Sequence, residues 1–446
     1  MTHRAGAGPL ATGPLATKAL TRVEGEGAMH VEIVDGRLVG VTLQIYEPPR
    51  FYEGFLRGRG HTEPPDITAR ICGICPVAYQ MSACLAIEQA CGVEVTDGIA
   101  ELRRLLYCGE WIESHTLHIH MLHAPDFLGV DSVVDLVALD RSAVERGLEL
   151  KKIGNELLEL IGGRAIHPVN VRVGGFYRPP SREALRAFRP RLARALELAV
   201  DVCEWVAGFD FPELDTDHEL VALDDGDHYP VFGDRIVSDR GLDIAVDEFG
   251  SHFEEFQVSH STAKHARLLS RGNYLVGPLA RYRLAREKLL PAAAAAASAA
   301  GLGATCPNPF RSIVVRAVEV VHACEEALRI TDGLIDASID TDPGSVAVPA
   351  RAGTGHGATE APRGLLYHRY TLDEAGTITD AEIVPPTSQN QPTIEHDLFH
   401  FVESRLDMAD DELARAAEVT IRNHDPCISC ATHFLDLTVE RRGRTP

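Results

Sequence analysis

Two Cys-x-x-Cys pairs are the residues of this chain best suited to chemistry, because each pair places two sulfurs within reach of one metal. Cys72 and Cys75 lie near the beginning of the 446 residues, and Cys427 and Cys430 lie near the end. The two pairs of a compact zinc ribbon are about 15–20 residues apart, so here only the tertiary fold can bring the four sulfurs together. Four thiolates suit soft metals such as zinc, nickel or iron.

The elements that must position these cysteines are predicted to be mainly helical. Ser181, which follows two prolines, is a suitable N-cap for a helix that starts at Arg182. The alanine-rich run 291–302 is predicted to be the end of a helix and a loop. Apolar residues recur at helical spacing in residues 102–122, 142–161, 182–206, 278–290, 312–331 and 392–406.

Strands are expected in two places. Residues 30–45 alternate between apolar and polar on both sides of an Asp-Gly turn, which predicts a hairpin. Residues 208–262 contain short strand-like runs between glycine and aspartate turns, which predict a small β region. We find no convincing linker within 19–433, and expect one mainly α unit with small β additions. Residues 1–18 contain a near-repeat of Gly-Pro-Leu-Ala-Thr and are expected to be a flexible tail.

The composition argues against several classes of partner. The formal net charge is −22, whereas nucleic acid and anionic membranes require a basic protein surface. No apolar run approaches the length of about 20 residues that spans a bilayer, and the N-terminus lacks a secretory signal. We therefore expect a cytoplasmic protein. Its other cysteines are scattered singly and are expected to be buried free thiols: Cys84, Cys91, Cys108, Cys203, Cys306 and Cys324.

The residues around both cysteine pairs resemble the two signature stretches of the large, catalytic subunit of nickel–iron hydrogenases. The likeness extends from residue 19 to the end. It implies the helical fold of that subunit and its activity, the reversible cleavage of H2 to protons and electrons. The matching stretches are 70–80 and 425–433, with additional matches in order at 22–25, 53–59, 115, 124–126, 167–168, 174–175 and 360–364.

The resemblance implies a role for each paired cysteine. Cys72 and Cys427 correspond to terminal nickel ligands, and Cys75 and Cys430 to ligands that bridge nickel to an iron carrying carbon monoxide and cyanide. Thiolates are soft donors that suit a nickel able to change its oxidation state, and metal binding secures their deprotonation. A structural zinc ion on the same four sulfurs is the simpler alternative.

Further residues are implied to control that centre. Arg363 and Thr387 correspond to residues that contact the diatomic ligands of the iron. Heterolytic cleavage of H2 requires a proton acceptor; the resemblance implies the Cys427 sulfur first and Glu24 next. Because a guanidinium stays protonated, we expect Arg363 to orient charge, and we expect Asp126 to pair with it.

A second metal ion is implied near the C-terminus. Glu53 and His433 correspond to ligands of a structural magnesium or similar ion, although a hard cation prefers oxygen ligands. In much of the family an endopeptidase removes the tail after the corresponding histidine once nickel is inserted. We therefore expect cleavage after His433 and loss of 434–446, although the alternating apolar pattern of this tail also suits a retained strand.

Several of these residues have simpler explanations. Arg22 and Glu24 alone would suit a surface ion pair, and residues 360–364 alone would suit a turn. Tyr79 stands where many relatives have histidine, so a hydrogen bond made there by an imidazole must be made differently. Four histidines resemble a metal cluster, but their spacing spreads them around a helix, so core packing is expected for most of His115, His118, His120 and His123.

The partners are implied by the resemblance as well. Residues 76–80 and 386–391 are similar to those of cytoplasmic, bidirectional hydrogenases, which work with an iron–sulfur small subunit and with diaphorase subunits that use flavin and NAD(P). NADP is the expected nucleotide. This chain has no Gly-x-Gly-x-x-Gly fingerprint, and its other cysteines lack iron–sulfur spacing, so electrons must leave through a partner.

Two related functions are compatible with the same resemblance. One is an H2 sensor that signals through a partner, and the presence of a C-terminal tail argues against it. The other is a hydrogenase-derived subunit of a respiratory complex, which uses the former metal cavity for quinone. Retention of all four cysteines argues against this second function.

Overall fold

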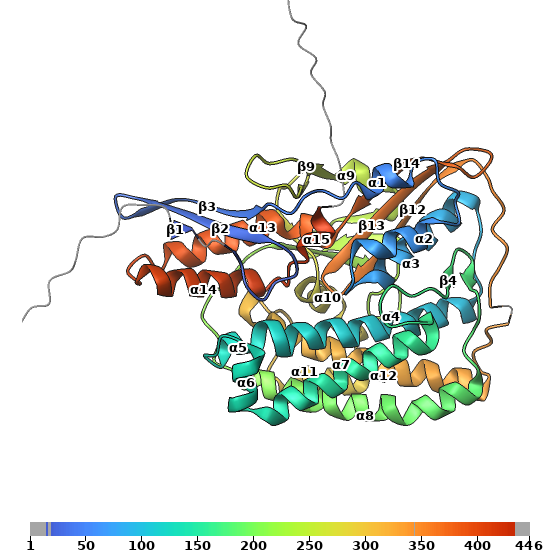
Figure 1. Ribbon diagram of the computed structural model, residues 1–446, viewed down its shortest axis with the longest axis horizontal. Helices are drawn as coiled ribbons and strands as arrows, with labels where there is room; N and C mark the ends of the chain where they lie inside the picture. The colour runs from blue at the N-terminus through green and yellow to red at the C-terminus, as the bar shows by residue number, and fades with distance from the viewer. Residues whose placement is uncertain (1–14, 17–18, 343, 433–446) are drawn as a thin grey trace, which may run out of the picture.

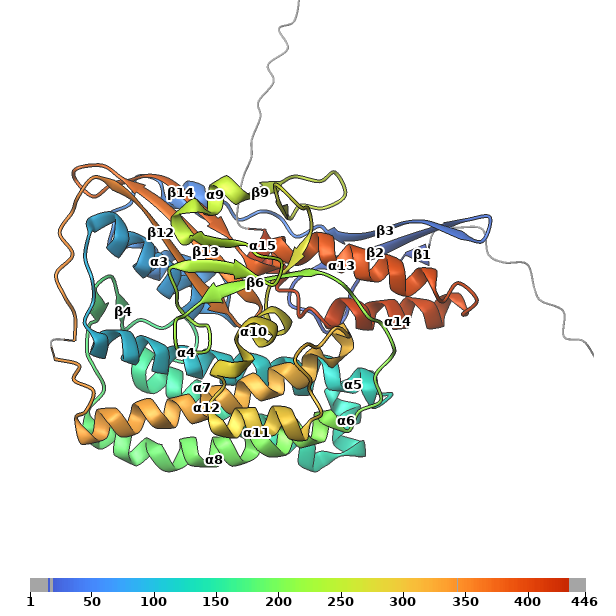
Figure 2. The same cartoon turned by 180° about the vertical axis from the view of Figure 1, so that it is seen from behind.

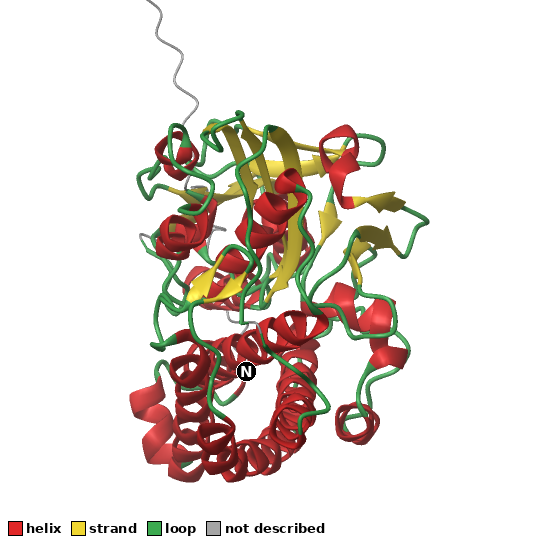
Figure 3. Cartoon of the chain, turned by 90° about the vertical axis from the view of Figure 1, so that its right-hand side faces the viewer, coloured by secondary structure: helices red, strands yellow, loops and turns green. Residues whose placement is uncertain are grey.

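Four long helices pack side by side in one half of the molecule (Figure 1), and most strands gather in the other half (Figure 3). The computed structural model describes residues 15–16, 19–342 and 344–432. The predicted mainly helical fold with smaller β additions is confirmed. The four long helices are α4 (Asp97–Leu117), α7 (Arg141–Gly162), α8 (Arg182–Ala207) and α12 (Ser312–Asp336).

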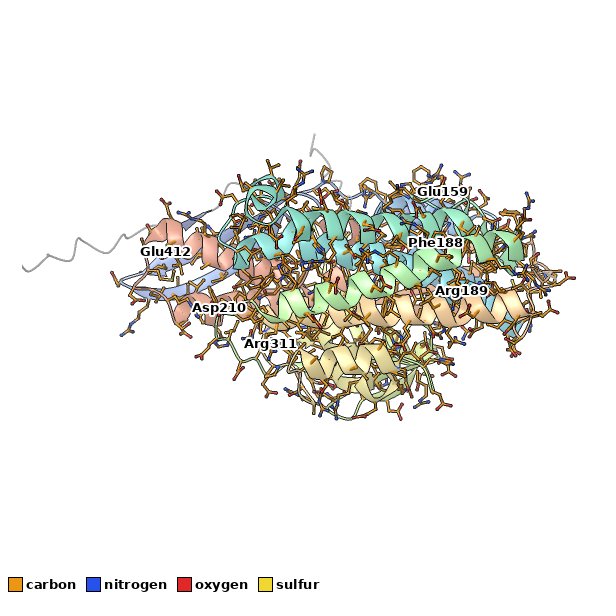
Figure 4. All side chains as sticks on the ribbon, turned by 90° about the horizontal axis from the view of Figure 1, so that it is seen from below. Glu159, Phe188, Arg189, Asp210, Arg311 and Glu412 are labelled. Carbon is orange, nitrogen blue, oxygen red and sulfur yellow. The ribbon has the colours of Figure 1, made fainter. Side chains whose placement is uncertain are left out.

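Three of these helices agree closely with the predicted ones. At the start of α8 the Ser181 hydroxyl accepts the N–H of Ala184 at 3.2 Å, as a serine N-cap should. In the view from below (Figure 4), α8, which carries Phe188 and Arg189, lies beside α7, which carries Glu159. This bundle forms one wall of the core.

The helix predicted over 102–122 is not regular throughout. After α4 the chain forms a wider, π-helical turn, η2 (His118–His123). In this turn His120 stacks on Trp205 of α8 and lies so close to α7 that a Cβ atom on Gly147 would meet its ring at 2.4 Å. Two short helices then lead to α7: α5 (Ala124–Phe127) and α6 (Val133–Leu139).

A three-stranded antiparallel sheet packs against a buried helix that the sequence patterns did not predict. Gly355 and Gly357 allow the contact, because a Cβ atom there would lie 2.0 Å from the Ala86 carbonyl oxygen and 2.4 Å from that of Ser82. The packing holds the start of the helix, and with it the first cysteine pair, deep in the core. The elements are α3 (Pro76–Cys91), β12 (Gly353–Ala361), β13 (Gly364–Leu372) and β14 (Ile378–Val384).

The predicted hairpin is confirmed and extends away from the body (Figure 1). It consists of β2 (Gly27–Val34) and β3 (Arg37–Ile45), which pair antiparallel. β1 (Leu15–Ala16) pairs with β2, so two residues of the expected N-terminal tail belong to a strand. The rest of 1–18 lies outside the described residues.

Two helices lie against the hairpin, and they share a small apolar core with it. The helix predicted over 392–406 begins earlier, at Pro386, because proline at the first position of a helix costs no hydrogen bond. The helix continues through Pro392. These helices are α13 (Pro386–Glu403) and α14 (Asp410–Arg422).

The small β region predicted over 208–262 is confirmed on the other side of the molecule (Figure 2), and it extends beyond these bounds by two strands, β10 and β11. It comprises β6 (Glu219–Asp224), β7 (Arg235–Ser238), β8 (Asp243–Ala245), β9 (Phe253–Phe256), β10 (His265–Leu268) and β11 (Tyr274–Leu275).

The predictions for 278–290 and 291–302 need correction. The first helix ends early, as α10 (Pro278–Ala285), and the alanine-rich run forms its own helix, α11 (Pro291–Ala299), rather than a loop. Alanine has the highest intrinsic helix propensity, and Pro291 suits the first helical position. The sequence pattern underestimated both effects.

The remaining elements are short. Within the described part of the chain, no helix combines the length and the apolar character that crossing a membrane requires. The short elements are α1 (Tyr52–Leu56), α2 (Pro64–Thr68), η1 (Ala69–Ile71), β4 (Val171–Arg172), β5 (Gly175–Phe176), η3 (Val246–Glu248), α9 (Phe249–His252), η4 (Arg286–Lys288), η5 (Pro309–Arg311) and α15 (Ile428–Ala431).

Candidate metal centre

The fold brings the four paired cysteines together in the core. The Cys72 Sγ lies 3.4 Å from that of Cys427, and the Cys75 Sγ lies 3.6 Å from that of Cys430. All four are buried free thiols, and their sulfurs lie within 4.8 Å of one another. The first residues of the two pairs therefore face each other, and so do the last.

The first pair is fixed by the start of α3. Cys75 immediately precedes this helix, and Pro76 takes its first position, where a missing N–H costs nothing. The Glu110 carboxyl group of α4 accepts the N–H of Val77 at 2.6 Å and that of Ala78 at 3.1 Å. Glu110 therefore replaces an N-cap side chain, and burial raises its pKa well above the usual value.

The second pair is held by polar contacts to separate elements. The Cys427 N–H donates to the Thr387 hydroxyl at 3.0 Å, at the start of α13. The Ile428 N–H donates to the Glu24 carbonyl oxygen at 2.9 Å, ahead of β2. Because α15 has only four residues, these contacts, rather than a long helix, determine where the second pair lies.

Arg50 joins the two cysteine segments. Its guanidinium donates to the Ile71 carbonyl oxygen at 2.7 Å, just before Cys72, and to the carbonyl oxygen of Ser429, between the two cysteines of the second pair. The backbone N–H of Arg50 also donates to the Thr432 carbonyl oxygen at 2.7 Å. One residue therefore sets the spacing between the segments.

The four sulfurs do not favour full deprotonation without a cation. A hydrogen bond from Cys427 lowers the pKa of Cys72 well below its usual value, whereas burial raises that of Cys427 and that of Cys430. One thiolate is therefore favoured, and its charge opposes the next. A metal cation would remove this repulsion and secure four thiolates, so the donor set fits a metal centre.

Arg363 lies in the turn between β12 and β13 and is buried beside the sulfurs. Its Nε donates to the Asp425 carbonyl oxygen at 2.8 Å, and its Nη2 to the Asp425 carboxylate at 3.1 Å. Burial opposes its charge, but Asp425 and the sulfurs of Cys427, Cys75 and Cys72 raise the pKa of Arg363 well above its usual value. Among the described residues its buried Nη1 has no hydrogen-bond partner, so it can donate to a group at the centre.

A buried ion-pair network supports the turn that carries Arg363. Arg281 pairs with Glu319 and Glu360 at 2.8 and 2.9 Å, and it donates to the Pro362 carbonyl oxygen at 2.9 Å. His115 Nε2 lies 3.0 Å from Glu319 on the other side. Residues 360–364 do form a turn, and these buried charges hold it in place.

The prediction that Asp126 pairs with Arg363 is wrong. Asp126 accepts from Arg22 and from the Arg422 Nε, the latter at 2.8 Å, and so ties the N-terminal segment to α5 and α14. The simple explanation of Arg22 as the ion-pair partner of Glu24 is wrong too, because its guanidinium binds Asp126. Sequence order could not decide among several arginines whose distances depend on the tertiary fold.

Glu24 lies beside the second pair, where a proton carrier is expected. The Cys427 thiol donates to Glu24 Oε2 at 3.1 Å, and the Ser429 N–H donates to the same oxygen at 3.0 Å. The Ser429 hydroxyl donates to Glu47 Oε1 at 3.0 Å. Both carboxylates are partly exposed, so they connect the buried sulfur with the surface.

Gly25 permits this close arrangement. Its φ of +95° is in the region that favours glycine, and a Cβ atom there would lie 2.6 Å from the Ile428 Cβ and 2.7 Å from Glu47 Oε2. Any side chain at this position would therefore displace α15 or Glu47.

Glu53 lines a cavity of about 360 Å³. Burial raises the pKa of Glu53 to about 7 and that of Glu255 to about 8, and the Ile383 N–H donates to Glu53 at 2.8 Å. Buried carboxyl groups gathered in one place suit a hard cation. The other expected ligand, His433, lies outside the described residues. Further charged residues around the cavity are Arg57, Glu254, Lys264, Arg369, Asp380 and Glu382.

The four histidines of 115–123 are buried in the core, as predicted for most of them, and two of them form hydrogen bonds. His118 Nε2 lies 2.8 Å from the Arg422 carbonyl oxygen, and His120 Nδ1 lies 3.1 Å from that of Thr116. Within the described residues they form no group with the spacing of metal ligands.

Tyr79 is buried beside the centre. Burial, together with the nearby sulfurs of Cys430 and Cys75, raises the pKa of Tyr79 well above its usual value. A neutral hydroxyl therefore stands at the position where many relatives have an imidazole.

Sequence reasoning missed several residues that shape the site: Arg50, Glu110, Arg281 and Asp425. Asp425 could have been found, because it lies inside a matched stretch and carries an obvious charge for Arg363. The other three act on residues far away along the chain, and no local pattern indicates such contacts.

The chain is similar to known proteins along most of its length. The family model described as nickel-dependent hydrogenase matches residues 50–146 and 271–433. Sulfhydrogenase 1 subunit alpha of Pyrococcus furiosus is 32% identical over 426 residues, which cover 95% of this chain and 99% of the relative. The NAD-reducing hydrogenase HoxS subunit beta of Cupriavidus necator is 30% identical over 93% of this chain and 94% of its own length.

A solved structure shows the same fold. The crystal structure of an NAD+-reducing NiFe hydrogenase in the H2-reduced state superposes with a TM-score of 0.84 and 27% identity, covering 95% of this chain and 100% of the other.

Proposed function

This chain belongs to the nickel-dependent hydrogenase family and is an oxidoreductase that acts on H2, and we propose that its four cysteines hold a nickel–iron centre whose iron carries cyanide and carbon monoxide. When bound, this group supplies the redox-active site at which H2 is split. The observation that carries the proposal is the buried group of four sulfurs, which face each other across the two pairs.

The cross-pair arrangement supports separate roles for the cysteines. Cys72 and Cys427, whose sulfurs lie 3.4 Å apart, are proposed as terminal nickel ligands. Cys75 and Cys430, 3.6 Å apart, are proposed to bridge to iron. Four thiolates fit both metals chemically.

Arg363 and Thr387 are proposed to hold the diatomic ligands of the iron. The buried Nη1 of Arg363 lacks a partner among the described residues, and it can donate to an anionic group such as cyanide. The Thr387 hydroxyl accepts the Cys427 N–H, and its own proton is available for donation. Arg363 lies in the turn between β12 and β13, and Thr387 lies at the start of α13, so ordered backbone keeps both donors in place.

Proton removal is proposed to follow Cys427, Glu24 and Glu47. The hydrogen bond of 3.1 Å from the Cys427 sulfur to Glu24 is short enough for transfer. Ser429 positions both carboxylates, since its N–H donates to Glu24 and its hydroxyl to Glu47, each at 3.0 Å. Arg363 is proposed to remain protonated and to orient charge. Asp126 is proposed to act at a distance, because its ion pair with Arg22 fixes the segment that carries Glu24.

The cavity around Glu53 is proposed to hold magnesium or a similar hard cation. Its carboxyl groups resist ionisation together, because burial and mutual repulsion raise the pKa of Glu53 and that of Glu255. A divalent cation would relieve this cost. His433 is proposed as a further ligand, as the resemblance implies.

An iron–sulfur small subunit is proposed to take the electrons. The other cysteines form no cluster-binding group among the described residues. The Tyr52 hydroxyl and the His167 ring bind carbonyl oxygens just before Cys72 at 2.9 and 2.7 Å, and exposed apolar side chains lie close to both residues in sequence. They form a suitable docking surface: Phe51, Phe55, Ile166 and Val169.

Diaphorase subunits with flavin are proposed to pass these electrons to NAD(P) in the cytoplasm. Two similar proteins are named for NAD reduction, which favours NAD over the NADP that we expected from sequence. In this complex the chain would be the H2-cleaving subunit.

Maturation is proposed to include an endopeptidase that cleaves after His433. The intact mass of the mature subunit tests this: loss of 434–446 is expected, and a full-length mass in active, nickel-loaded enzyme would contradict it.

The proposed function is tested by measuring H2-dependent NAD(P) reduction and the nickel and iron contents of the purified complex. The wild type should contain one nickel and one iron in this subunit, and Cys72→Ser should lose both nickel and activity. Cys306→Ser, at a partly exposed cysteine away from the centre, is the matched control. Zinc in place of nickel and iron would contradict the proposal.

A further inference from the structure

A second group of possible metal ligands lies at the surface on α13, away from the four cysteines. It consists of His218, in the segment before β6, and of His396 and Asp397 on α13. The Asp397 side chain is fully buried, that of His218 is 6% exposed and that of His396 is 46% exposed. A buried carboxylate therefore stands beneath two imidazoles, one of which reaches solvent.

The three donor atoms converge. His218 Nε2 lies 2.6 Å from Asp397 Oδ1, and His396 Nδ1 lies 3.7 Å from the same oxygen. All three atoms lie within 4.8 Å of one another, which is the separation of ligands that share one ion. Two imidazoles and one carboxylate form a donor set that borderline divalent transition ions prefer, whereas magnesium and calcium prefer oxygen.

Two further histidines contact the donor residues at atoms that do not face the shared centre. His400 Nε2 lies 3.1 Å from His396 Nε2, the nitrogen that points away from Asp397. His424 Nε2 lies 3.0 Å from Asp397 Oδ2, the oxygen that His218 does not use. Ligands of protein metal sites are commonly held in this way, by a hydrogen bond to the atom that does not bind the ion.

We propose that His218, His396 and Asp397 bind one divalent transition ion of the zinc class, with water completing its coordination on the exposed side of His396. The ion would take the place of the proton shared between His218 and Asp397, so that binding releases a proton. Hydrogen bonds to Asp397 are enough to explain why His218 and His424 lie beside it. They do not explain why two solvent-exposed imidazoles, those of His396 and His400, gather at the same place.

Such an ion would brace the frame of the metal centre. α13 carries Thr387, which holds Cys427, and His424 lies next to Asp425, which holds Arg363. The ion would link α13 to the segment before β6. Because His424 binds Asp397, it would also connect α13 to the residues that directly precede the second cysteine pair. The inference concerns a separate site and does not depend on the chemistry proposed for the four sulfurs.

The test is zinc binding by the purified complex. Weakly bound ions are removed with EDTA, the protein is dialysed against micromolar ZnCl2, and zinc per subunit is determined by elemental analysis. His396→Ala is the central variant, since its half-exposed side chain can be removed without opening the core. His228→Ala, at an exposed histidine elsewhere, is the matched control.

The wild type and His228→Ala should each bind one zinc more per subunit than His396→Ala. X-ray absorption at the zinc edge should show a nitrogen and oxygen shell without sulfur, which separates this site from the cysteines. Equal zinc content in the wild type and His396→Ala, or a sulfur shell, would overturn the proposal.

Discussion

The two cysteine pairs contribute the same ligands but are built in different ways. The first pair sits at the start of α3, a sixteen-residue helix buried between the sheet and α4. In the second pair Cys427 precedes α15, a helix of four residues, and Cys430 lies within it. This pair is held by hydrogen bonds to Glu24, Thr387 and Arg50. Packing therefore positions one half of the centre, and polar contacts position the other.

This difference indicates how the centre assembles. α3 can adopt its place with the rest of the core, because its contacts are apolar and numerous. The second pair reaches its place only when the C-terminal segment docks on three distant elements. We expect the second half to be the more sensitive to single changes, and the following variants test that expectation from the largest effect to the smallest.

Removal of a paired cysteine should have the largest effect. Cys427→Ser takes away a proposed nickel ligand and the first proton acceptor, so activity and nickel should both be lost. Elemental analysis and H2 oxidation assays provide the measurement. Cys324→Ser, at a buried cysteine outside the centre, should keep both; retention of nickel by Cys427→Ser would contradict the ligand assignment.

Glu24→Gln should separate proton transfer from metal binding. The amide preserves the hydrogen bonds from the segment but cannot carry a proton, so activity should fall by about 10²–10⁴-fold with unchanged nickel and iron. Glu26→Gln, at an exposed neighbour, is the control and should be active. A fall of less than about tenfold for Glu24→Gln would show that protons leave by another path.

Arg363→Lys should weaken the electrostatic support of the centre. Lysine keeps the charge but cannot reach Asp425 and the sulfurs with three separate donors, so activity should decrease about 10²-fold while the metals stay bound. Arg369→Lys, at a partly exposed arginine of β13, the strand that follows Arg363, should behave like the wild type. Equal losses in both variants would indicate a general effect on the strand.

The Glu53 cavity should make stability depend on pH when the cation is removed. Glu53 has a pKa of about 7 in the folded protein instead of the usual 4.5, so between these values the folded state binds more protons than the unfolded state. The free energy of unfolding should therefore fall by about 3 kcal/mol as pH rises through this window.

Thermal unfolding checks this cavity. EDTA should lower the melting temperature more at pH 8 than at pH 5, and added Mg2+ should restore it. Glu53→Gln should remove most of the difference. The same EDTA effect at both pH values would argue against a cation held by these carboxylates.

Thr387→Val should have the smallest effect and compare the two halves directly. It removes the acceptor of the Cys427 N–H at almost constant volume, which costs about 1–3 kcal/mol. Amide hydrogen exchange should accelerate in α15 and stay unchanged at the start of α3. Equal acceleration in both segments would mean that the two halves open as one unit.

The sequence predicted the parts of the fold that have an amphipathic pattern. α7 and α8 each present one apolar face, and the β2–β3 hairpin alternates around its turn, so their patterns were sufficient. α3 and the β12–β14 sheet were missed because they are buried on several sides, and a helix or strand without a polar face has no clear period.

The candidate site divides in the same way. The four cysteines and Glu24 followed from local matches, and the structure brings them together. Asp126 was assigned to the wrong arginine, and Glu110 and Arg50 were not recognised, because each acts on a residue remote in sequence. Long-range contacts of this kind leave no trace in local spacing.

The most direct test of the central claim is an infrared spectrum of the anaerobically purified complex. The account predicts stretching bands of metal-bound carbon monoxide and cyanide, and their loss in Cys427→Ser. Absence of these bands from protein whose mass shows complete maturation would contradict a nickel–iron centre on the four cysteines.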